Sequence, residues 1–315
     1  MRVSPTPAGW RGQPGRLLPL LLLAALGAAA PGCSRPSAAS HGHLTIQNKG
    51  SDTIVNLAQA WAEAYKKVAP DVSIEVSGGG SGVGLAALIK GTIDIANSSR
   101  DIKPSEVEEA KRSTGKEPCD FIVGYDALAI YVHKDNPLEE ITFEQLAGIY
   151  AEGGTLTHWS DLGVSLPGGR NKIIRVSRQS SSGTYEFFRE RVLHNRDFKL
   201  GSNDMNGSKE VVDLVGNTPG AIGYSGMGYA NPRVKMLRVA VRAGSPAVAP
   251  TVENTLSKAY PIARSLHMFT LGQPEGATKA YLDWILSDAG QEIVAQCGFV
   301  PVAPNHRTGQ ARPAP

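Results

Sequence analysis

The stretch VSIEVSGGGSGVGLAALIKGTIDIA, residues 72–96, decides the fold class of this 315-residue chain. Its first residues, 72–76, alternate between apolar and polar side chains, which is typical of a β-strand. A run of glycine and serine at 78–82 follows, then an apolar helical stretch at 85–90 and a second strand at 93–96. A strand, a loop, a helix and another strand in this order predict a βαβ unit and a parallel sheet.

The same order of strand, Ser/Thr-Gly cluster and helix occurs twice more. In one copy the strand is 43–47, the cluster is 50–53 (GSDT) and the helix is 54–68. In the other, the strand is 173–176, the cluster is 180–184 (SSSGT) and the helix is 185–193. Parallel sheets bind ligands beyond the carboxyl ends of their strands, which is where all three clusters are expected to lie.

The three clusters predict a binding site for a small anion. A helix N-terminus has unpaired N–H groups and about half a positive charge, and the hydroxyl groups add further donors. Arg178 precedes the third cluster, and a fourth cluster at 98–100 ends in Arg100. Together these groups are a set of donors suited to an oxyanion. The alternative is that Ser, Thr and Gly serve there only as helix caps and turns.

Two long apolar segments indicate how the chain divides into lobes. Residues 121–133 and 260–271 are rich in β-branched and aromatic residues, as buried strands are. Because they lie far apart in sequence, we expect them to be two crossings between a pair of α/β lobes. The predicted segments are 44–125 with 260–305 for lobe I, 126–259 for lobe II, and 306–315 for a disordered tail.

The first 32 residues have the features of a secretory signal peptide. Three arginines precede an apolar stretch at 17–30, which is too short to span a bilayer and leads to Cys33. Cleavage before Cys33 and attachment of a lipid to it would leave residues 33–43 as a flexible tether, and ordinary signal cleavage is the alternative. We therefore expect a location in the periplasm or on the outer cell surface, with a lipid anchor through Cys33.

The net charge argues against a nucleic-acid-binding surface. The chain has a formal charge of +3, and this excess lies in the predicted signal peptide, so the mature chain is close to neutral. Binding to nucleic acid generally requires a basic excess. Cysteine, histidine and carboxylate residues show no metal-ligand spacing either, and we expect no cofactor.

Besides Cys33, the sequence contains two cysteines, Cys119 and Cys297. In an exported protein such a pair is a candidate disulfide, and two buried free thiols are the alternative. Both positions fall in the predicted lobe I.

Nucleotide-binding and hydrolytic motifs are incomplete in this chain. A P-loop needs Lys and Ser/Thr directly after its second glycine, where this chain has Leu85 and Ala86. An exported serine hydrolase acting on a small anionic ester is the main alternative function, with Ser81 or Ser182 as nucleophile. Neither serine lies in the Gly-x-Ser-x-Gly pattern of a nucleophile elbow. The histidines available as a base are His133, His158, His194 and His267.

Taken in order, the clusters resemble the phosphate-binding proteins of the phosphate-specific ABC transporter (the PstS type). The elements that carry the resemblance are GSDT at 50–53, GGGSG at 78–82, DIANSSR at 94–100, THWSDL at 157–162, RQSSSGT at 178–184 and PGAIGY at 219–224. The similarity covers about residues 44–304, and the Arg-x-x-x-Ser-Gly-Thr element that begins at Arg178 is its most specific part.

The resemblance implies a type II periplasmic binding protein, an α/β fold of two lobes with two crossover segments and a ligand cleft between the lobes. It implies capture of inorganic phosphate outside the inner membrane, without catalysis, and delivery to the membrane permease of an ABC importer. We expect a monomer. The residues implied to bind phosphate are Ser51, Thr53, Ser81, Ser99, Arg100, Arg178, Ser182, Gly183 and Thr184.

The chain departs from the family at the acid that accepts the proton of hydrogen phosphate. Familiar members have an aspartate near position 100, where this chain has Ser99 and Arg100, and some have another in the place of Ser180. A carboxylate facing the ligand favours phosphate over sulfate, because sulfate has no proton to give at neutral pH. We expect Asp52, the acid within the clusters, to take this role, with Asp101 as the next candidate. Helix capping is the alternative role for Asp52.

Overall fold

The structure is a computed structural model that describes residues 44–307 and 312–313. The predicted signal peptide at 1–32, the lipid anchor at Cys33 and the tether at 33–43 lie outside these residues. Among the helices of the described part, none combines the length and the apolar character that crossing a bilayer requires.

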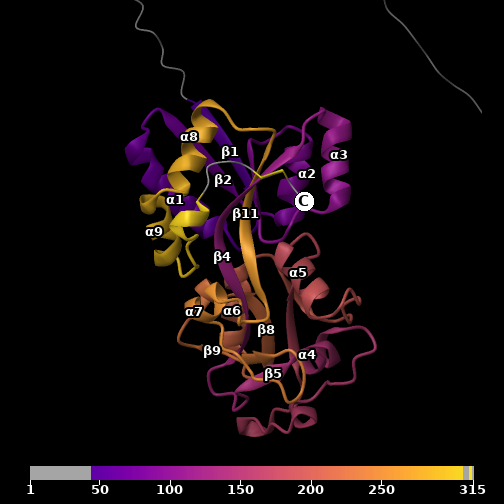
Figure 1. Cartoon of the computed structure of the whole chain (residues 1–315). Coiled ribbons are helices and arrows are strands. Elements are labelled where there is room, and N and C mark those ends of the chain that lie inside the picture. The colour runs from indigo at the N-terminus through magenta and orange to yellow at the C-terminus, as the bar shows by residue number, and fades with distance from the viewer. Residues whose placement is uncertain (1–43, 308–311, 314–315) are drawn as a thin grey trace, which may run out of the picture. The chain divides into compact units, whose positions relative to one another are not determined.

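Eight strands follow one another in the order β2-β1-β3-β11-β4-β8-β6-β7 (Figure 1). Their bounds are β1 Leu44–Gly50, β2 Val72–Ser77, β3 Ile95–Ser98, β4 Pro118–His133, β6 Ile174–Arg178, β7 Asn203–Met205, β8 Ala221–Gly226 and β11 Ala263–Leu271. The predicted parallel pairing is confirmed at both ends, since β1 is parallel to β2 and β3, and β6 is parallel to β7 and β8. The shorter strands are β9 Val234–Met236 and β12 Arg312–Pro313, which pair with β4, and β5 Glu140–Thr142 and β10 Arg238–Ala240, which pair with each other.

The α-helices of the described residues surround these strands. They are α1 Val55–Val68, α2 Ser81–Ile89, α3 Pro104–Thr114, α4 Phe143–Tyr150, α5 Gly183–Arg191, α6 Ser208–Asn217, α7 Val252–Leu256, α8 Gly276–Ile285 and α9 Asp288–Gln296. Short 3-10 turns lie at Trp159–Leu162, Pro167–Gly169, Met227–Tyr229 and Pro304–His306.

Each of the three Ser/Thr-Gly clusters leads directly into a helix, as predicted. α2 begins at Ser81, four residues before the predicted start, because Gly80 turns the chain with a φ of 97°. α5 begins at Gly183, where the Ser182 hydroxyl accepts a hydrogen bond from the Thr184 amide at 3.1 Å. The backbone geometry of Gly80 is one that side chains disfavour, so the position of this helix start depends on glycine.

β4 and β11 are the two crossings, and they lie side by side through the middle of the molecule (Figure 1). They pair antiparallel from Pro118–Leu271 to Ala127–Ala263, and β4 then continues to pair with β8 and β9. One hydrophobic core packs around Trp61 and the first half of β4, and another around Tyr150 and the second half. The fold therefore has the two predicted lobes. The lobe boundaries remain a prediction, since β4 runs without a break from one lobe into the other.

The structure differs from the predicted disulfide. Cys119 is a buried free thiol, and Cys297 is a half-buried one. Cys119 lies near the start of β4, whereas Cys297 follows α9, and its carbonyl lies against Gly228. The two cysteines are therefore free thiols on separate elements of the structure.

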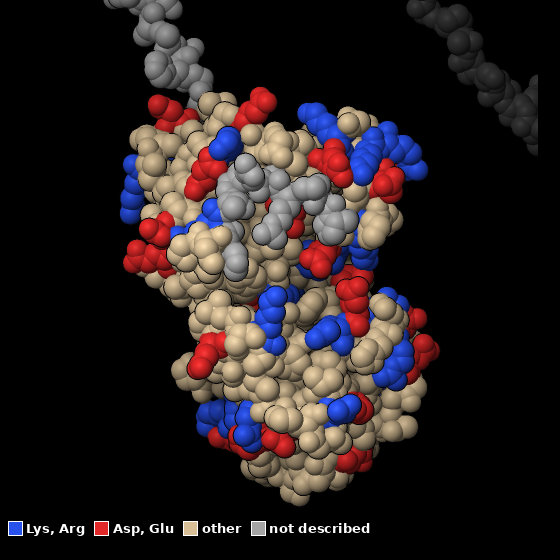
Figure 2. All heavy atoms as spheres, viewed as in Figure 1, with Lys and Arg blue, Asp and Glu red and all other residues tan. Residues whose placement is uncertain are grey.

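Two further features concern the surface and the chain end. Basic and acidic side chains are interspersed on the face shown in Figure 2. Within the predicted disordered tail, Arg312 and Pro313 differ from the prediction, because they pair with Asp120 and Cys119 of β4.

Candidate functional site

Five hydroxyl side chains from the predicted site lie together, and we name them the hydroxyl cluster: Ser51, Thr53, Ser81, Ser99 and Thr184. All five are almost completely buried. The Ser51 hydroxyl donates to Ser99 at 2.9 Å, and Ser81 lies 3.4 Å from Ser99. Thr53 lies 2.9 Å from Thr184, and its amide donates to the Ser51 hydroxyl at 3.2 Å. The sequence prediction that the separate clusters converge on one place is therefore confirmed.

The hydroxyl cluster spans both lobes. Thr184 belongs to α5 in the second lobe, and the other four residues belong to the first. The lobes also meet where the Gly82 amide donates to the Ser181 carbonyl at 3.0 Å. Gly183 permits this approach, because a Cβ there would lie 2.3 Å from the Ser81 hydroxyl and 2.8 Å from that of Ser99. A side chain at Gly183 would therefore push the lobes apart.

Arg178 reaches this region from the end of β6 with a fully buried side chain. Its Nη1 donates to the Ser208 hydroxyl at 3.0 Å, and its Nη2 donates to the Asn206 carbonyl at 2.8 Å and to Asp52 Oδ2 at 3.2 Å. Its Nε is buried without a hydrogen-bond partner among the described residues. Burial lowers the pKa of the Arg178 guanidinium, and the charge of Asp52 opposes this shift. A buried cation with a free donor is suited to an anion.

Asp52 connects the two lobes and is not a helix cap. Its Oδ1 accepts a hydrogen bond from the Gly79 amide at 2.8 Å, while Oδ2 faces Arg178. α1 is preceded by Ile54 and has no side-chain capping bond. The helix-capping alternative for Asp52 is therefore wrong.

Ser208 was not predicted from the sequence, yet it lies at the site. It is the first residue of α6, and its hydroxyl lies 3.5 Å from Thr53 Oγ1 as well as near Arg178. The sequence signal was a Gly-Ser pair, Gly207-Ser208, before a helix, as in the other clusters. Three helices, α2, α5 and α6, thus begin at residues of this site, and α1 begins two residues after Thr53. The first turn of a helix has amides without a partner inside the helix.

Arg100 uses both of its Nη groups outside the hydroxyl cluster, and its Nε is buried without a hydrogen-bond partner among the described residues. Its Nη1 and Nη2 donate to the two carboxylate oxygens of Glu106 at 2.8 and 2.7 Å, and Nη1 also donates to the Asp101 carbonyl at 2.8 Å. Glu106 lies nearby because it belongs to the first turn of α3 and accepts the Lys103 amide at 2.8 Å. The Arg100 side chain therefore joins the third cluster to α3, and Glu106 takes up both of its Nη groups.

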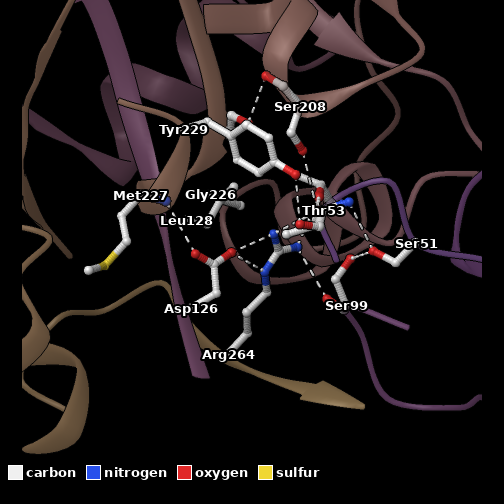
Figure 3. A network of polar contacts seen from close by, with 12 residues as sticks. Ser51, Thr53, Ser99, Asp126, Leu128, Ser208, Gly226, Met227, Tyr229 and Arg264 are labelled. Carbon is white, nitrogen blue, oxygen red and sulfur yellow. Dashed lines mark hydrogen bonds and ion pairs between the residues drawn. The ribbon is translucent and has the colours of Figure 1, made fainter. Parts of the chain in front are cut away.

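Arg264 and Asp126 are the main site residues that the sequence analysis missed. They face each other across β11 and β4, with Arg264 Nη2 at 2.8 Å from Asp126 Oδ2, and both side chains are buried (Figure 3). Arg264 also contacts the hydroxyls of Thr53 and Thr184. The available signal was a single charged residue within each of the two predicted apolar strands. Buried charges are rarely tolerated unless they are paired, so these two could have been matched.

His267 joins the third cluster to the crossing strands. Its Nδ1 lies 2.8 Å from Asp120 of β4, and its Nε2 lies 3.2 Å from Asp101. Burial alone lowers the pKa of His267, but the hydrogen bonds to Asp101 and Asp120 outweigh this effect and raise it from 6.5 to about 9. Asp101, the second candidate for the proton acceptor, is thus directed at His267.

We expect the free energy of unfolding to fall as the pH rises from about 6.5 to about 9, because the folded protein holds the His267 proton more tightly than the unfolded chain does. The raised pKa corresponds to about 3 kcal/mol of stability, present in full below pH 6.5 and lost above pH 9. Urea unfolding across this range, compared with His267→Gln, measures the effect. The variant should lack this pH-dependent loss, and equal slopes in both proteins would contradict the prediction.

The arrangement does not support serine hydrolysis. The Ser81 hydroxyl contacts Ser99, and the Ser182 hydroxyl accepts from the Thr184 amide. Among the described residues, neither serine has a hydrogen bond to a histidine, and the partners of His267 are carboxylates. No group of three or more His, Cys, Asp or Glu side chains in the described part is placed to hold a metal ion.

Comparison with known proteins places this site in a family. Residues 35–289 match the family model of the PBP superfamily domain. The phosphate-binding protein PstS of Pseudomonas aeruginosa is 33% identical over 290 residues, which are 89% of this chain and 89% of that protein. PstS of Bacillus subtilis is 32% identical over 263 residues, 83% of this chain and 81% of that protein.

Solved structures agree with these relatives. A Clostridium perfringens structure, assigned to the substrate-binding protein of a phosphate ABC transporter and solved with bound phosphate, is 31% identical with a TM-score of 0.71. It is matched over its whole length by 82% of this chain. An ABC-type phosphate transport receptor from Vibrio cholerae is 26% identical with a TM-score of 0.65, again over 82% of this chain and 100% of the other.

Proposed function

Because the chain belongs to the family of PstS-type phosphate-binding proteins, within the PBP superfamily, we propose that its hydroxyl cluster and Arg178 bind one phosphate ion between the lobes. As a member of this family, the protein is a substrate-binding component of an ABC importer for inorganic phosphate and not an enzyme. It works outside the cytoplasm and hands the ion to the membrane permease of that importer.

The observation that carries the proposed site is the convergence of buried hydroxyls from both lobes, which Ser208 connects to Arg178. Phosphate must lose its water on entering, which is costly unless protein donors replace that water. The hydroxyls, the helix N-termini and the free Nε of Arg178 supply such donors. We propose as ligands Ser51, Asp52, Thr53, Ser81, Ser99, Arg178, Ser182, Gly183 and Thr184, with Arg100 holding the third cluster through Glu106.

Binding then couples to lobe movement. The hydroxyl cluster is buried where the lobes touch, so an ion can enter only when they separate. We propose that they open by bending β4 and β11 and close again around the ion, as hinged binding proteins do. We further propose a signal peptide at 1–32, a lipid on Cys33 as the membrane anchor, and a monomer in solution.

Calorimetric titration of the phosphate-stripped protein with phosphate, sulfate and molybdate tests the proposed function. We expect saturable binding of phosphate with one ion per chain, and much weaker binding of the other two anions. A protein that binds none of the three, or that prefers sulfate, would refute the proposal.

We expect Asp52→Asn to narrow the preference for phosphate over sulfate by roughly tenfold or more. The Asp52 carboxylate lies beside Arg178, where it can accept the proton of hydrogen phosphate and repel sulfate. Asparagine keeps the shape but carries no charge. The measurement is the ratio of the two dissociation constants.

Asp101→Asn is the matched control for this prediction. Asp101 is paired with His267, and its side chain is 80% exposed, so this variant should keep the discrimination. If Asp52→Asn keeps the full preference for phosphate over sulfate and Asp101→Asn loses it, Asp101 is the proton acceptor.

A further inference from the structure

Arg264 has five N–H donors, and the structure provides each of them with an acceptor. Figure 3 shows Arg264 beside Asp126, Thr53 and Ser99. Nε and Nη2 donate to Asp126 Oδ2 at 3.0 and 2.8 Å. Nη2 also donates to Thr53 Oγ1 at 3.4 Å, and Nη1 donates to Thr184 Oγ1 at 3.1 Å and to the Ser99 carbonyl at 3.2 Å. Since all five donors are engaged, Arg264 acts on a bound ion through these partners and not by direct contact.

The partners of Arg264 come from both lobes and from the hinge. Thr53 precedes α1 and Ser99 follows β3 in the first lobe, whereas Thr184 lies in α5 of the second. Arg264 itself is on β11, directly opposite Asp126 on β4. One side chain on a crossing strand therefore contacts proposed ligand residues of both lobes at once.

These bonds also fix the direction of two hydroxyl protons. A guanidinium has no acceptor, so a hydroxyl that contacts it must accept and use its own proton elsewhere. Thr53 Oγ1 and Thr184 Oγ1 both accept from Arg264 and lie 2.9 Å apart, so one proton lies between them. The other proton points away from Arg264. An oxyanion is bound through hydrogen-bond donors, and a hydroxyl proton that points away from Arg264 is such a donor.

We infer that Arg264 is a positioning residue that orients the hydroxyl pair of Thr53 and Thr184, so that the one proton not shared between them can be donated to the bound ion. It also ties this pair to the two crossing strands. The inference rests on the proposed binding of phosphate at the hydroxyl cluster. Asp126 holds the guanidinium in place from the neighbouring strand.

The test is a double-mutant cycle in which the binding of inorganic phosphate to each variant is measured by calorimetry. Arg264→Lys keeps the charge beside Asp126 but has one nitrogen in place of three, and we expect the dissociation constant to rise at least about tenfold. In a Thr184→Val background the same substitution should raise the dissociation constant by a factor at least about threefold smaller, because one hydroxyl that Arg264 orients is gone. A merely structural role of Arg264 would give additive losses.

Arg191→Lys is the matched control. Arg191 lines the same cavity of about 700 Å³ as Arg264, but its Nε donates to the Pro261 carbonyl at 2.9 Å. We expect its dissociation constant to stay within about twofold of the wild type, because its donor is directed away from the cluster. If Arg264→Lys does not fold, Arg264→Gln combined with Asp126→Asn replaces it. This exchange removes both buried charges together and leaves neither unpaired, and the same loss of affinity is expected.

The outcomes separate the inference from the proposed function. If the wild type binds phosphate and the variants bind it equally well or show additive losses, the role of Arg264 is overturned and the proposed function stands. Wild type that binds no phosphate would overturn the proposed function first. A loss in Arg264→Lys that shrinks in the Thr184→Val background supports the inference.

Discussion

Arg178→Ala should weaken phosphate binding by at least about 2 kcal/mol, or roughly thirtyfold in dissociation constant. Arg178 is a fully buried cation from the second lobe, and its Nε has no hydrogen-bond partner in the part of the chain that the structure describes. Its removal takes away a charge-assisted donor. It also leaves Asp52 facing the anion without its partner, so repulsion adds to the loss. Calorimetric titration of the phosphate-stripped variant measures the effect.

Arg175→Ala is the matched control for this substitution. Arg175 lies on the same strand, but its guanidinium donates to the Leu200 carbonyl at 2.7 Å and to the Ser202 hydroxyl at 3.3 Å, away from the cluster. This variant should bind as the wild type does. If Arg178→Ala also binds within about threefold of the wild type, a loss far below that of truncating a buried charged partner, Arg178 is not part of the site.

Asp126→Ala should lower the free energy of unfolding by about 3 to 5 kcal/mol, because it leaves Arg264 as an unpaired charge in the interior. Burial raises the pKa of Asp126, and the guanidinium of Arg264 opposes that shift. Asp126 also accepts the Met227 amide at 3.2 Å, which the variant leaves without this partner. Urea unfolding of the ligand-free protein, monitored by fluorescence, measures the change.

Asp197→Ala is the control here, because Asp197 pairs with Arg189 at 2.9 Å but is 74% exposed, and exposed pairs contribute little. We expect no measurable change in its unfolding. The paired exchange Asp126→Asn with Arg264→Gln should recover part of the stability lost in Asp126→Ala. Asp126→Ala that unfolds at the same urea concentration as the wild type would show that the buried pair contributes nothing.

The local pattern of the sequence was enough to predict much of the site. Ser/Thr-Gly clusters after strands predicted helix starts, and parallel strands bring such starts to one edge, so the convergence of Ser51, Ser81 and Thr184 followed. The sequence pattern places a residue after a strand, but it does not reveal which neighbour the side chain contacts. Arg100 was expected at the cluster, but Glu106 in the next helix binds it.

Contacts between distant strands were beyond local patterns. The Arg264–Asp126 pair depends on the register between β11 and β4, which lie more than a hundred residues apart in sequence. Whether Cys119 can meet Cys297 depends on the same register and on where the chain returns after α9, and both are free thiols in the structure. Two oppositely charged residues in two apolar strands were visible in the sequence, but their pairing became evident only from the fold.

The arginines of the site loops and of β11 each have a carboxylate partner: Arg178 with Asp52, Arg264 with Asp126, and Arg100 with Glu106. The pairs cancel in formal charge, so the binding region offers phosphate oriented dipoles and little net positive charge. Dissolved ions weaken long-range attraction between charges, whereas dipoles in contact with a buried ion are shielded from them. Phosphate uptake through this protein should therefore tolerate wide changes in the salinity of the surroundings, at the expense of any electrostatic attraction that would draw the ion in from a distance.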